Sequence, residues 1–272
     1  MEPLVLAAVS LWTGFLASGV VKLYRGRGLV KKNYRGRPVA PALGPVLIIG
    51  HLPAVVLPAW SGRSIPLALT ADLAFLGVAF SGLWDDLLED EVSGFQGHLR
   101  SGLQGRITSG LLKIAAMALA AAPFCGLLES SWPHKIAALL LVLASANGLN
   151  LLDRRPGRAL KLFFGGSLLL LFSAPQPEML RLLLPWLAAA LVVAPWDLDA
   201  EGMLGDCGAN LLGAVLGVGA VLALPLPAQL GLLFFWLAVN LSSEVVSFSR
   251  LIEEVPLLRF LDLLGRSREK IS

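Results

Sequence analysis

Long apolar runs, separated by short polar stretches, dominate this sequence of 272 residues. A helix needs about 20 mainly apolar residues to cross the hydrocarbon core of a bilayer. None of the polar stretches is long enough to form a separate soluble domain. We therefore predict an all-α, polytopic membrane helix bundle with about nine transmembrane helices. They are expected near residues 3–22, 42–60, 64–84, 109–128, 134–151, 159–174, 178–196, 207–224 and 227–247.

The composition agrees with a multi-pass protein of the cell membrane. Charged residues make up 15% of the chain and hydrophobic residues 56%, whereas about a quarter of an average soluble domain is charged. The first apolar run has no basic region before it and no small-residue cleavage site after it, so we interpret it as a retained span rather than a signal peptide. Two cysteines are too few for a disulfide framework.

The placement of Lys and Arg predicts the orientation, because cytoplasmic loops are enriched in these residues. Of the 22 Lys and Arg, only Arg63, Lys135 and Arg181 fall outside the side on which the odd-numbered predicted spans end. We predict that this side is cytoplasmic, with the N-terminus outside and the C-terminus inside. Residues 1–248 would form the transmembrane domain. Residues 249–272 alternate apolar and charged residues at helical spacing, which predicts a tail lying in the cytoplasmic membrane interface.

Four aspartates stand at helix–loop junctions on the predicted cytoplasmic side. Asp85 and Asp86 lie in GLWDD, Asp153 in NGLNLLD and Asp206 in LGDCGAN. A carboxylate at the membrane boundary costs roughly a few kcal/mol unless it is solvated, paired or bound to a cation. If the three loops converge, these carboxylates repel one another, and a divalent cation such as Mg²⁺ would relieve the repulsion. The pattern predicts a metal site.

The same side is rich in groups that bind phosphate. Guanidinium groups bind phosphate in a bidentate way and lysine acts as a point charge. The basic residues near the acidic motifs include Lys113, Arg154, Arg155 and Arg158. Asn147 and Asn150, about one helical turn apart, would orient a carboxylate or contact a polar ligand. His98 could act as a general base, but the sequence favours a solvated loop histidine.

Each motif also has a structural interpretation. The Asp-Asp pair is compatible with a helix end in water, RRPGR with a cytoplasmic anchor, and Asp206 with an N-cap. All of these interpretations must hold together on one face of the molecule. Their joint occurrence favours a site for a metal ion and a phosphate or pyrophosphate.

The order of the motifs, DD, then N-x-x-N-x-x-D, then G-D-x-G, resembles the polyprenyl-phosphate N-acetylhexosamine-1-phosphate transferases. This family includes the phospho-N-acetylmuramoyl-pentapeptide transferase of peptidoglycan synthesis. The resemblance runs from about residue 33 to 225. Asp85 and Asp86 match the aspartate pair of the family, and Lys113 its lysine. The remaining matches are Asn147, Asn150 and Asp153 with the Asn-Asn-Asp motif, and Asp206 with the aspartate of M-G-D-x-G.

The resemblance implies transfer of a sugar-1-phosphate from a nucleotide-diphospho-sugar to polyprenyl phosphate, giving a polyprenyl-diphospho-sugar and UMP. It implies Mg²⁺, or Mn²⁺ in its place, held by Asp206 and Asp85. Asp85, Asp86 and Asp153 would be catalytic. The substrate phosphates would be bound by Lys113, Asn147, Asn150, Arg154, Arg155 and Arg158. The expected partners are the lipid and the nucleotide-sugar donor rather than nucleic acid. A homodimer is left open.

Two departures from the family keep other functions open. Asp153-Arg154-Arg155-Pro156-Gly157 stands where the family often has D-G-x-D-G, so the second aspartate is missing. The late histidine-rich cytoplasmic loop of the larger members is absent as well. One alternative is a non-catalytic relative that binds polyprenyl phosphate. The other is a transporter of a phosphorylated lipid or an ion, for which Asp72 and Glu244 are acidic candidates within a span.

Overall fold

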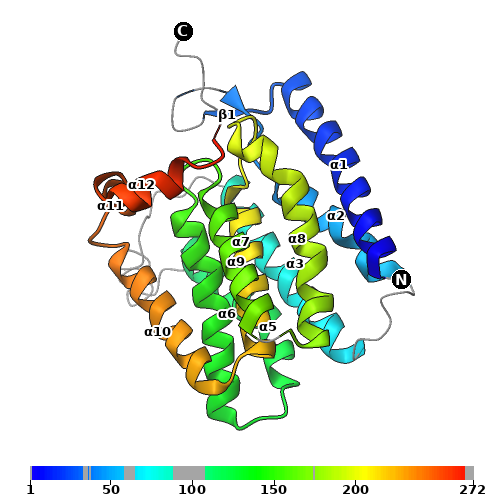
Figure 1. Cartoon of the computed structure of the whole chain (residues 1–272), viewed down its shortest axis with the longest axis vertical. Coiled ribbons are helices and arrows are strands. Elements are labelled where there is room, and N and C mark those ends of the chain that lie inside the picture. Colours follow the sequence, from blue (N-terminus) through cyan, green and yellow to red (C-terminus); the bar gives the residue numbers. More distant parts are fainter. Residues whose placement is uncertain are drawn as a thin grey trace.

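A computed structural model describes residues 2–32, 36, 38–57, 65–87, 108–173 and 175–266. In these ranges the chain is almost entirely helical, with one two-stranded antiparallel hairpin near the N-terminus (Figure 1). The elements are α1 (Glu2–Gly26), β1 (Lys31–Lys32), β2 (Pro38–Val39), α2 (Gly44–Val56), α3 (Ile65–Leu87), α5 (Ser109–Gly126), α6 (Trp132–Leu152), α7 (Arg158–Ser173), α8 (Pro177–Leu198), α9 (Gly205–Ala223), α10 (Leu226–Ser242), α11 (Phe248–Glu254) and α12 (Pro256–Leu263).

The all-α membrane fold predicted from the apolar runs is confirmed, and each predicted span overlaps a helix. Six of the described helices are long and apolar enough to cross a membrane: those within α1, α3, α5, α6, α8 and α9. The helices α2, α7 and α10 have 13, 16 and 17 residues, or about 20–25 Å of helix. The count of nine spans and the orientation of the termini therefore stay predictions.

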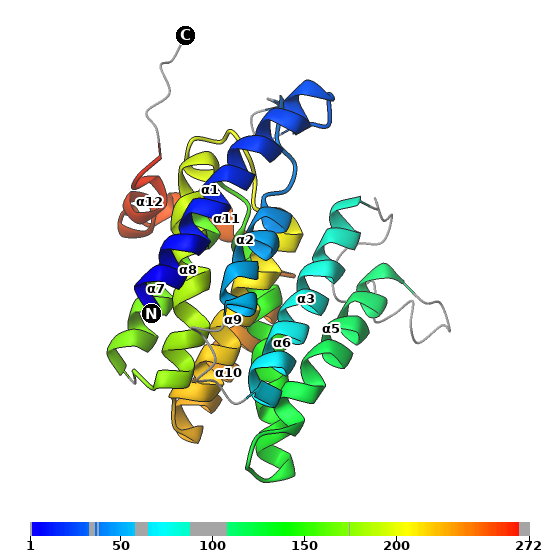
Figure 2. The ribbon, with the colours of Figure 1, turned by 90° about the vertical axis from the view of Figure 1, so that its right-hand side faces the viewer.

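Helix α9 is the centre of the bundle. It packs against α6, α3, α7, α8 and α2, and most of its side chains are buried. Its sequence is rich in Gly and Ala, which allow neighbouring backbones to approach closely. Gly213, for example, lies directly against the backbone of Ser145 and Ala146 on α6. Figure 2 shows α1 beside α2 and α3 beside α5 around this centre.

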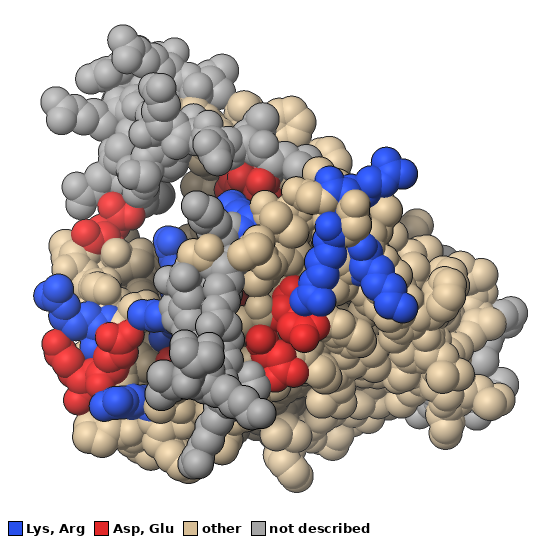
Figure 3. Space-filling model, turned by 90° about the horizontal axis from the view of Figure 1, so that it is seen from above, with Lys and Arg blue, Asp and Glu red and all other residues tan. Residues whose placement is uncertain are grey.

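One end of the bundle gathers the polar helix ends. Neighbouring helices run in opposite directions, so the ends of α3, α6 and α8 meet the starts of α5, α7 and α9 there. The segment before α2 runs along the segment before α9. The amide of Met203 donates to the carbonyl of Ala40 at 3.0 Å, and the amide of Leu43 to the carbonyl of Met203 at 2.8 Å. Viewed onto this end, acidic and basic side chains lie close to one another (Figure 3).

Candidate functional site

Asp86 lies in the last turn of α3 and reaches the first turn of α9. Its carboxylate accepts hydrogen bonds from the backbone amides of Asp206 at 3.1 Å and Cys207 at 3.0 Å. The first amides of a helix have no partner within the helix, and Leu204, the N-cap residue of α9, makes no side-chain cap. A carboxylate from α3 thus caps α9 in place of a side chain from its own N-terminus. The interpretation of Asp206 as the cap is wrong.

The neighbouring Asp85 faces α5 instead. The Lys113 ammonium donates to Asp85 Oδ2 at 2.5 Å and to Asp206 Oδ2 at 3.1 Å. Asn150 Nδ2 on α6 donates to the same Asp206 oxygen at 3.0 Å. We call these four residues the four-helix cluster, since α3, α5, α6 and α9 each supply one. The structure thus brings together residues from three separate sequence motifs and the predicted lysine.

Two glycines make this convergence sterically feasible. A Cβ on Gly82, the glycine of GLWDD, would lie 2.4 Å from the carbonyl oxygen of Asp206. Gly205 has a φ of 70°, in the region that glycine adopts without steric cost. A Cβ there would also lie 2.7 Å from Asp86 Oδ2. A larger residue at either position would push α3 away from α9 and separate the carboxylates.

The four-helix cluster combines an excess of negative charge with access to water. The side chains of Lys113, Asp85 and Asp206 are 10%, 24% and 39% exposed. One ammonium faces two carboxylates, and Asp86 adds a third nearby, so the local charge stays negative. Within the described ranges, no three His, Cys, Asp or Glu side chains form a ready-made metal site. Mg²⁺ commonly binds through one or two carboxylates together with water and substrate phosphates, so Asp85 and Asp206 fit it as a donor set.

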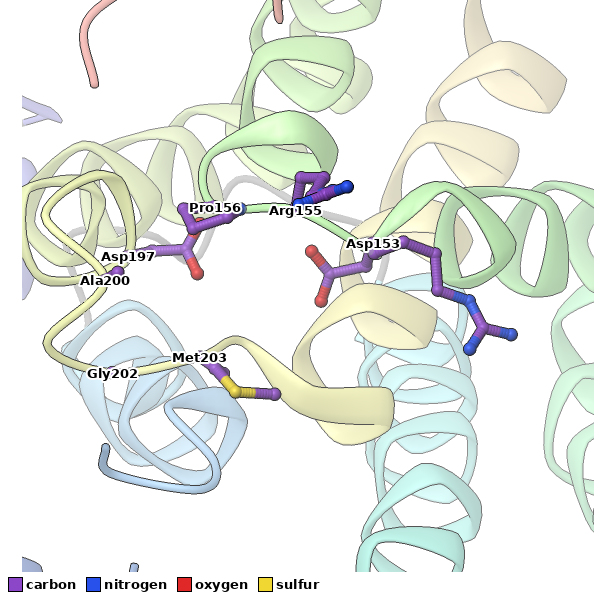
Figure 4. A pocket seen from close by; sticks show the side chains of 8 residues that line it. Asp153, Arg155, Pro156, Asp197, Ala200, Gly202 and Met203 are labelled. Atoms are coloured by element: carbon purple, nitrogen blue, oxygen red, sulfur yellow. The ribbon is translucent and has the colours of Figure 1, made fainter. Parts of the chain in front are cut away.

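A pocket of about 50 Å³ lies next to the four-helix cluster, enough for a few water molecules. The carboxylates of Asp153 and Asp197 both point into it (Figure 4). Its lining is completed by Arg154, Arg155, Pro156, Ala200, Gly202 and Met203. Burial, and then the negative charges of Asp197, Asp206 and Asp86, raise the pKa of Asp153 well above its usual range, although Arg158 opposes the shift. Asp153 therefore retains a proton more readily than a solvated aspartate.

Sequence reasoning missed Asp197. Its side chain is buried, 2% exposed, and it accepts a hydrogen bond from the amide of Gly157 at 2.7 Å and another from the backbone of Leu204. It therefore fastens the loop between α6 and α7, which follows Asp153, to the start of α9. An aspartate at the polar end of an apolar run was the available signal. The sequence WDLDAEG holds two aspartates and a glutamate, so nothing in it distinguished the buried one.

Other predicted residues lie outside the cluster. Asn147 donates to Asn240 on α10 at 2.5 Å and so contributes to helix packing. Arg155 pairs with Glu253 at 2.9 Å, and Arg158 with Asp262 at 2.9 Å. Arg154 is exposed beside the pocket. His98 lies outside the described residues.

The two acidic candidates for a transport pathway are placed differently from each other. Asp72 is buried in α3, and its carboxylate lies 3.5 Å from Nε2 of His51 on α2. The His51 ring stacks on Trp186 of α8, with ring centres 3.9 Å apart. Glu244 lies exposed after the end of α10. Asp72 thus belongs to a contact between three helices, away from the polar end.

Comparison with known proteins does not identify the chain. A scan against models of protein families finds no match, and a search of curated proteins finds no significant match. The resemblance to the polyprenyl-phosphate transferases therefore depends on the sequence motifs alone.

Proposed function

We propose that the protein is a membrane transferase that moves a sugar-1-phosphate from a nucleotide-diphospho-sugar to polyprenyl phosphate. The observation that carries the proposal is the four-helix cluster. It holds Lys113 and Asn150 against Asp85 and Asp206 at the polar end of an apolar bundle. This arrangement offers both cation ligands and phosphate-binding donors. A lipid whose phosphate lies at the membrane boundary would reach it without leaving the bilayer.

The reaction requires one bond to form and one to break. An oxygen of the polyprenyl phosphate attacks the phosphorus that carries the sugar. The bond from that phosphorus to the bridging oxygen then breaks, and UMP leaves with that oxygen. A phosphate monoester is already largely ionised near pH 7, so no strong base is needed to prepare the attacking oxygen.

The residues of the site have distinct roles in this proposal. Lys113 and Asn150 bind phosphate oxygens and offset the negative charge that develops on the leaving phosphate. Asp85 and Asp206 hold Mg²⁺, or Mn²⁺, which when bound supplies Lewis-acid stabilisation of the phosphates. Asp153, with its raised pKa, donates a hydrogen bond from its protonated carboxyl to a bound phosphate or polar ligand. Asp86 caps the N-terminus of α9 and so positions Asp206.

A transport function is the second candidate, favoured by the buried His51–Asp72 pair. Ionisable residues within membrane spans commonly mark transport pathways. The pair lies between α2, α3 and α8, whereas the four-helix cluster lies at the polar end. A transporter would release no UMP from a nucleotide-sugar, so one assay separates the two functions.

The test uses the full chain, purified in detergent, with undecaprenyl phosphate, Mg²⁺ and a panel of UDP-sugars. We expect UMP release that requires both the lipid and the metal ion. Asp206→Asn should abolish it, because the substitution removes a charged ligand from the cluster. Asp199→Asn is the matched control, since Asp199 is an exposed aspartate seven residues earlier on the same side. Release that survives Asp206→Asn unchanged would contradict the proposal.

A further inference from the structure

The C-terminal helices α11 and α12 lie beside the bundle near its polar end, next to the end of α10, rather than within it (Figure 1). Helix α12 has eight residues, and almost all of its apolar side chains face outward. The exposed residues are Leu257, Leu258, Phe260, Leu261 and Leu263, followed by Leu264, with exposures between 36% and 66%. In contact with water this would be an unfavourable arrangement, because the hydrophobic effect drives such side chains inward.

The polar face of α12 is turned toward the protein and centres on Asp262. Its carboxylate accepts two hydrogen bonds from the Arg158 guanidinium, at 2.9 and 3.2 Å. A third comes from Arg266 at 2.7 Å. The backbone carbonyl of Asp262 also accepts from Lys161 Nζ at 2.5 Å. The side chains of Arg158 and Asp262 are only 5% and 10% exposed, so water competes little for these bonds.

Further contacts attach the tail to the loop that follows Asp153. Arg266 donates to the carbonyl of Pro156 at 2.9 Å. Arg155 pairs with Glu253 on α11 at 2.9 Å, and Arg158 donates to Ser249 at 3.3 Å. The loop between α6 and α7 is therefore contacted by α11, through Glu253, and by Arg266, which follows α12. Asp262 on α12 contacts the start of α7.

The carboxylate of Asp262 remains ionised at neutral pH. Burial opposes ionisation of Asp262, but the hydrogen bonds and charge of Arg158, with the charges of Arg266 and Lys161, outweigh it and lower the pKa of Asp262. The carboxylate of Asp262 therefore stays ionised near neutral pH.

We propose that α11 and α12 form a membrane-seated clamp. The outer apolar face of α12 inserts into the headgroup region of the bilayer. On the inner side of the tail, Asp262 holds the start of α7, and Glu253 and Arg266 hold the α6–α7 loop. The inference does not depend on the proposed function. It also assigns Arg158 to the clamp, away from substrate phosphates.

The bilayer, rather than a second copy of the chain, fits this face. The end of α10 and the residues after it, which lead directly into α11, expose Leu241, Val245 and Val246, so the apolar surface of the bundle continues into the tail. The exposed Arg250 and Arg259 would meet anionic headgroups. An eight-residue helix is about 12 Å long. Its face is too small for the 1,200 Å² or so that a stable protein–protein interface buries.

The membrane contact is tested with the full chain in phosphatidylcholine–phosphatidylglycerol vesicles. A nitroxide label is attached to Phe260→Cys or, as a control, to Glu254→Cys on the neighbouring helix. The native Cys125 and Cys207 are buried, and labelling of the unsubstituted chain gives the background. We expect the label at 260 to collide more often with oxygen than with a water-soluble nickel chelate, and the label at 254 to show the reverse.

Equal access of the nickel chelate to both labels would overturn the proposal. So would label–label broadening at 260 that disappears on dilution with unlabelled protein, because it would show contact between copies.

The clamp is tested by hydrogen exchange of the segment 153–161 in the same vesicles. Asp262→Asn should speed exchange there by roughly tenfold, because the loop opens locally more often. Glu254→Gln should leave it unchanged. Phe260→Gln leaves the polar face of the tail intact, and it should speed exchange in the same segment if membrane contact and loop position are coupled. Unchanged exchange in Phe260→Gln would overturn the coupling. A monodisperse elution profile of each variant establishes that the bundle is folded.

Discussion

The four-helix cluster and the tail clamp are built from the same kinds of residues, but their charge balance is opposite. In the four-helix cluster one cation, Lys113, lies between two carboxylates that are 24% and 39% exposed. In the clamp one carboxylate, Asp262, is bound by the side chains of Arg158 and Arg266, and all three side chains are at most 13% exposed. The first group keeps negative charge within reach of water. The second has more cations than carboxylates and is largely shielded from water.

This difference separates a binding site from a structural contact. A saturated and buried ion network has no free capacity for a ligand, and removing one partner leaves an uncompensated charge. A partly exposed group with spare negative charge can bind a cation, and through it a phosphate. Residue type alone would place Arg158 and Lys113 in the same class. Exposure and the number of partners distinguish them.

The largest effect is expected from Lys113→Met, which tests the excess of negative charge in the four-helix cluster. Without the ammonium, Asp85 and Asp206 repel each other, so we expect a loss of roughly 2 kcal/mol in the free energy of unfolding. If the protein is a transferase, UMP release should fall about 10²- to 10³-fold. Thermal unfolding at increasing Mg²⁺ should show a larger stabilisation of the variant than of the unsubstituted chain, because a divalent cation binds best where the ammonium was.

Lys135→Met is the matched control for that experiment. Lys135 lies at the opposite end of the bundle, where it donates to the carbonyl of Gly126 and lies over Trp132. Its removal should leave the Mg²⁺ dependence of unfolding unchanged. An equal response of both variants to Mg²⁺ would show that the cation acts elsewhere.

Asp197→Ala should have the next largest effect. It tests whether Asp197 stabilises the pocket by joining the α6–α7 loop to the start of α9. Asp197 binds the backbones of Gly157 and Leu204. Its loss leaves buried amides without an acceptor, which should cost about 1–2 kcal/mol. Asp199→Ala, at an exposed position, should cost less than about 0.5 kcal/mol. Chemical denaturation of both variants measures the difference. Similar values would mean that Asp197 is not the fastening point between the two loops.

The alternating helix directions explain how much of the site was predictable. Apolar runs of sufficient length predict helices, and successive spans that cross in opposite directions bring every second helix end to the same side. Asp85, Lys113 and Asp206 could therefore be expected at one end of the bundle. Lys113 contacts both aspartates, although it is 28 positions from Asp85 and 93 from Asp206 in the sequence.

Side-chain direction could not be predicted in the same way. Adjacent residues on a helix point about 100° apart, and nothing in GLWDD shows which aspartate faces α5 and which caps α9. The role of Arg158 is set by Asp262, which lies 104 positions away in the tail. The sequence predicted no contact between this tail and the bundle. Asp197 is buried by packing between loops, which periodicity does not report. The fold and the convergence of the motifs follow from local patterns, whereas these contacts depend on tertiary structure.

The pH dependence of unfolding should differ in sign between Asp153 in the pocket beside the cluster and Asp262 in the clamp. The pKa of Asp262 is lowered in the folded state, so its stabilising contribution is present above the unfolded pKa near 3.9 and is lost as pH falls through the folded pKa. The pKa of Asp153 is raised. The folded state then binds the extra proton, and stability decreases as pH rises from about 3.9 to the folded pKa.

Two variants resolve these contributions. Asp262→Asn should reduce the loss of stability below about pH 4, and Asp153→Asn should reduce the decrease above that pH. The measurement is the denaturant midpoint of each variant from pH 3 to 8, in the same detergent. A steeper acid loss in Asp262→Asn than in the unsubstituted chain would contradict the assigned direction of its pKa shift.

The smallest effect is expected from Asp86→Asn, which distinguishes the role of Asp86 from that of the neighbouring Asp85. The amide keeps one acceptor oxygen for the amides of Asp206 and Cys207 but loses the charge that the helix N-terminus favours. We expect a loss of about 1 kcal/mol in the free energy of unfolding and only a modest fall in UMP release. Asp85→Asn, which removes a charged ligand of the cluster, should lower release far more. If Asp86→Asn instead abolished release with stability unchanged, Asp86 would act on the substrate directly, and the division of the pair into a ligand and a helix cap would be wrong.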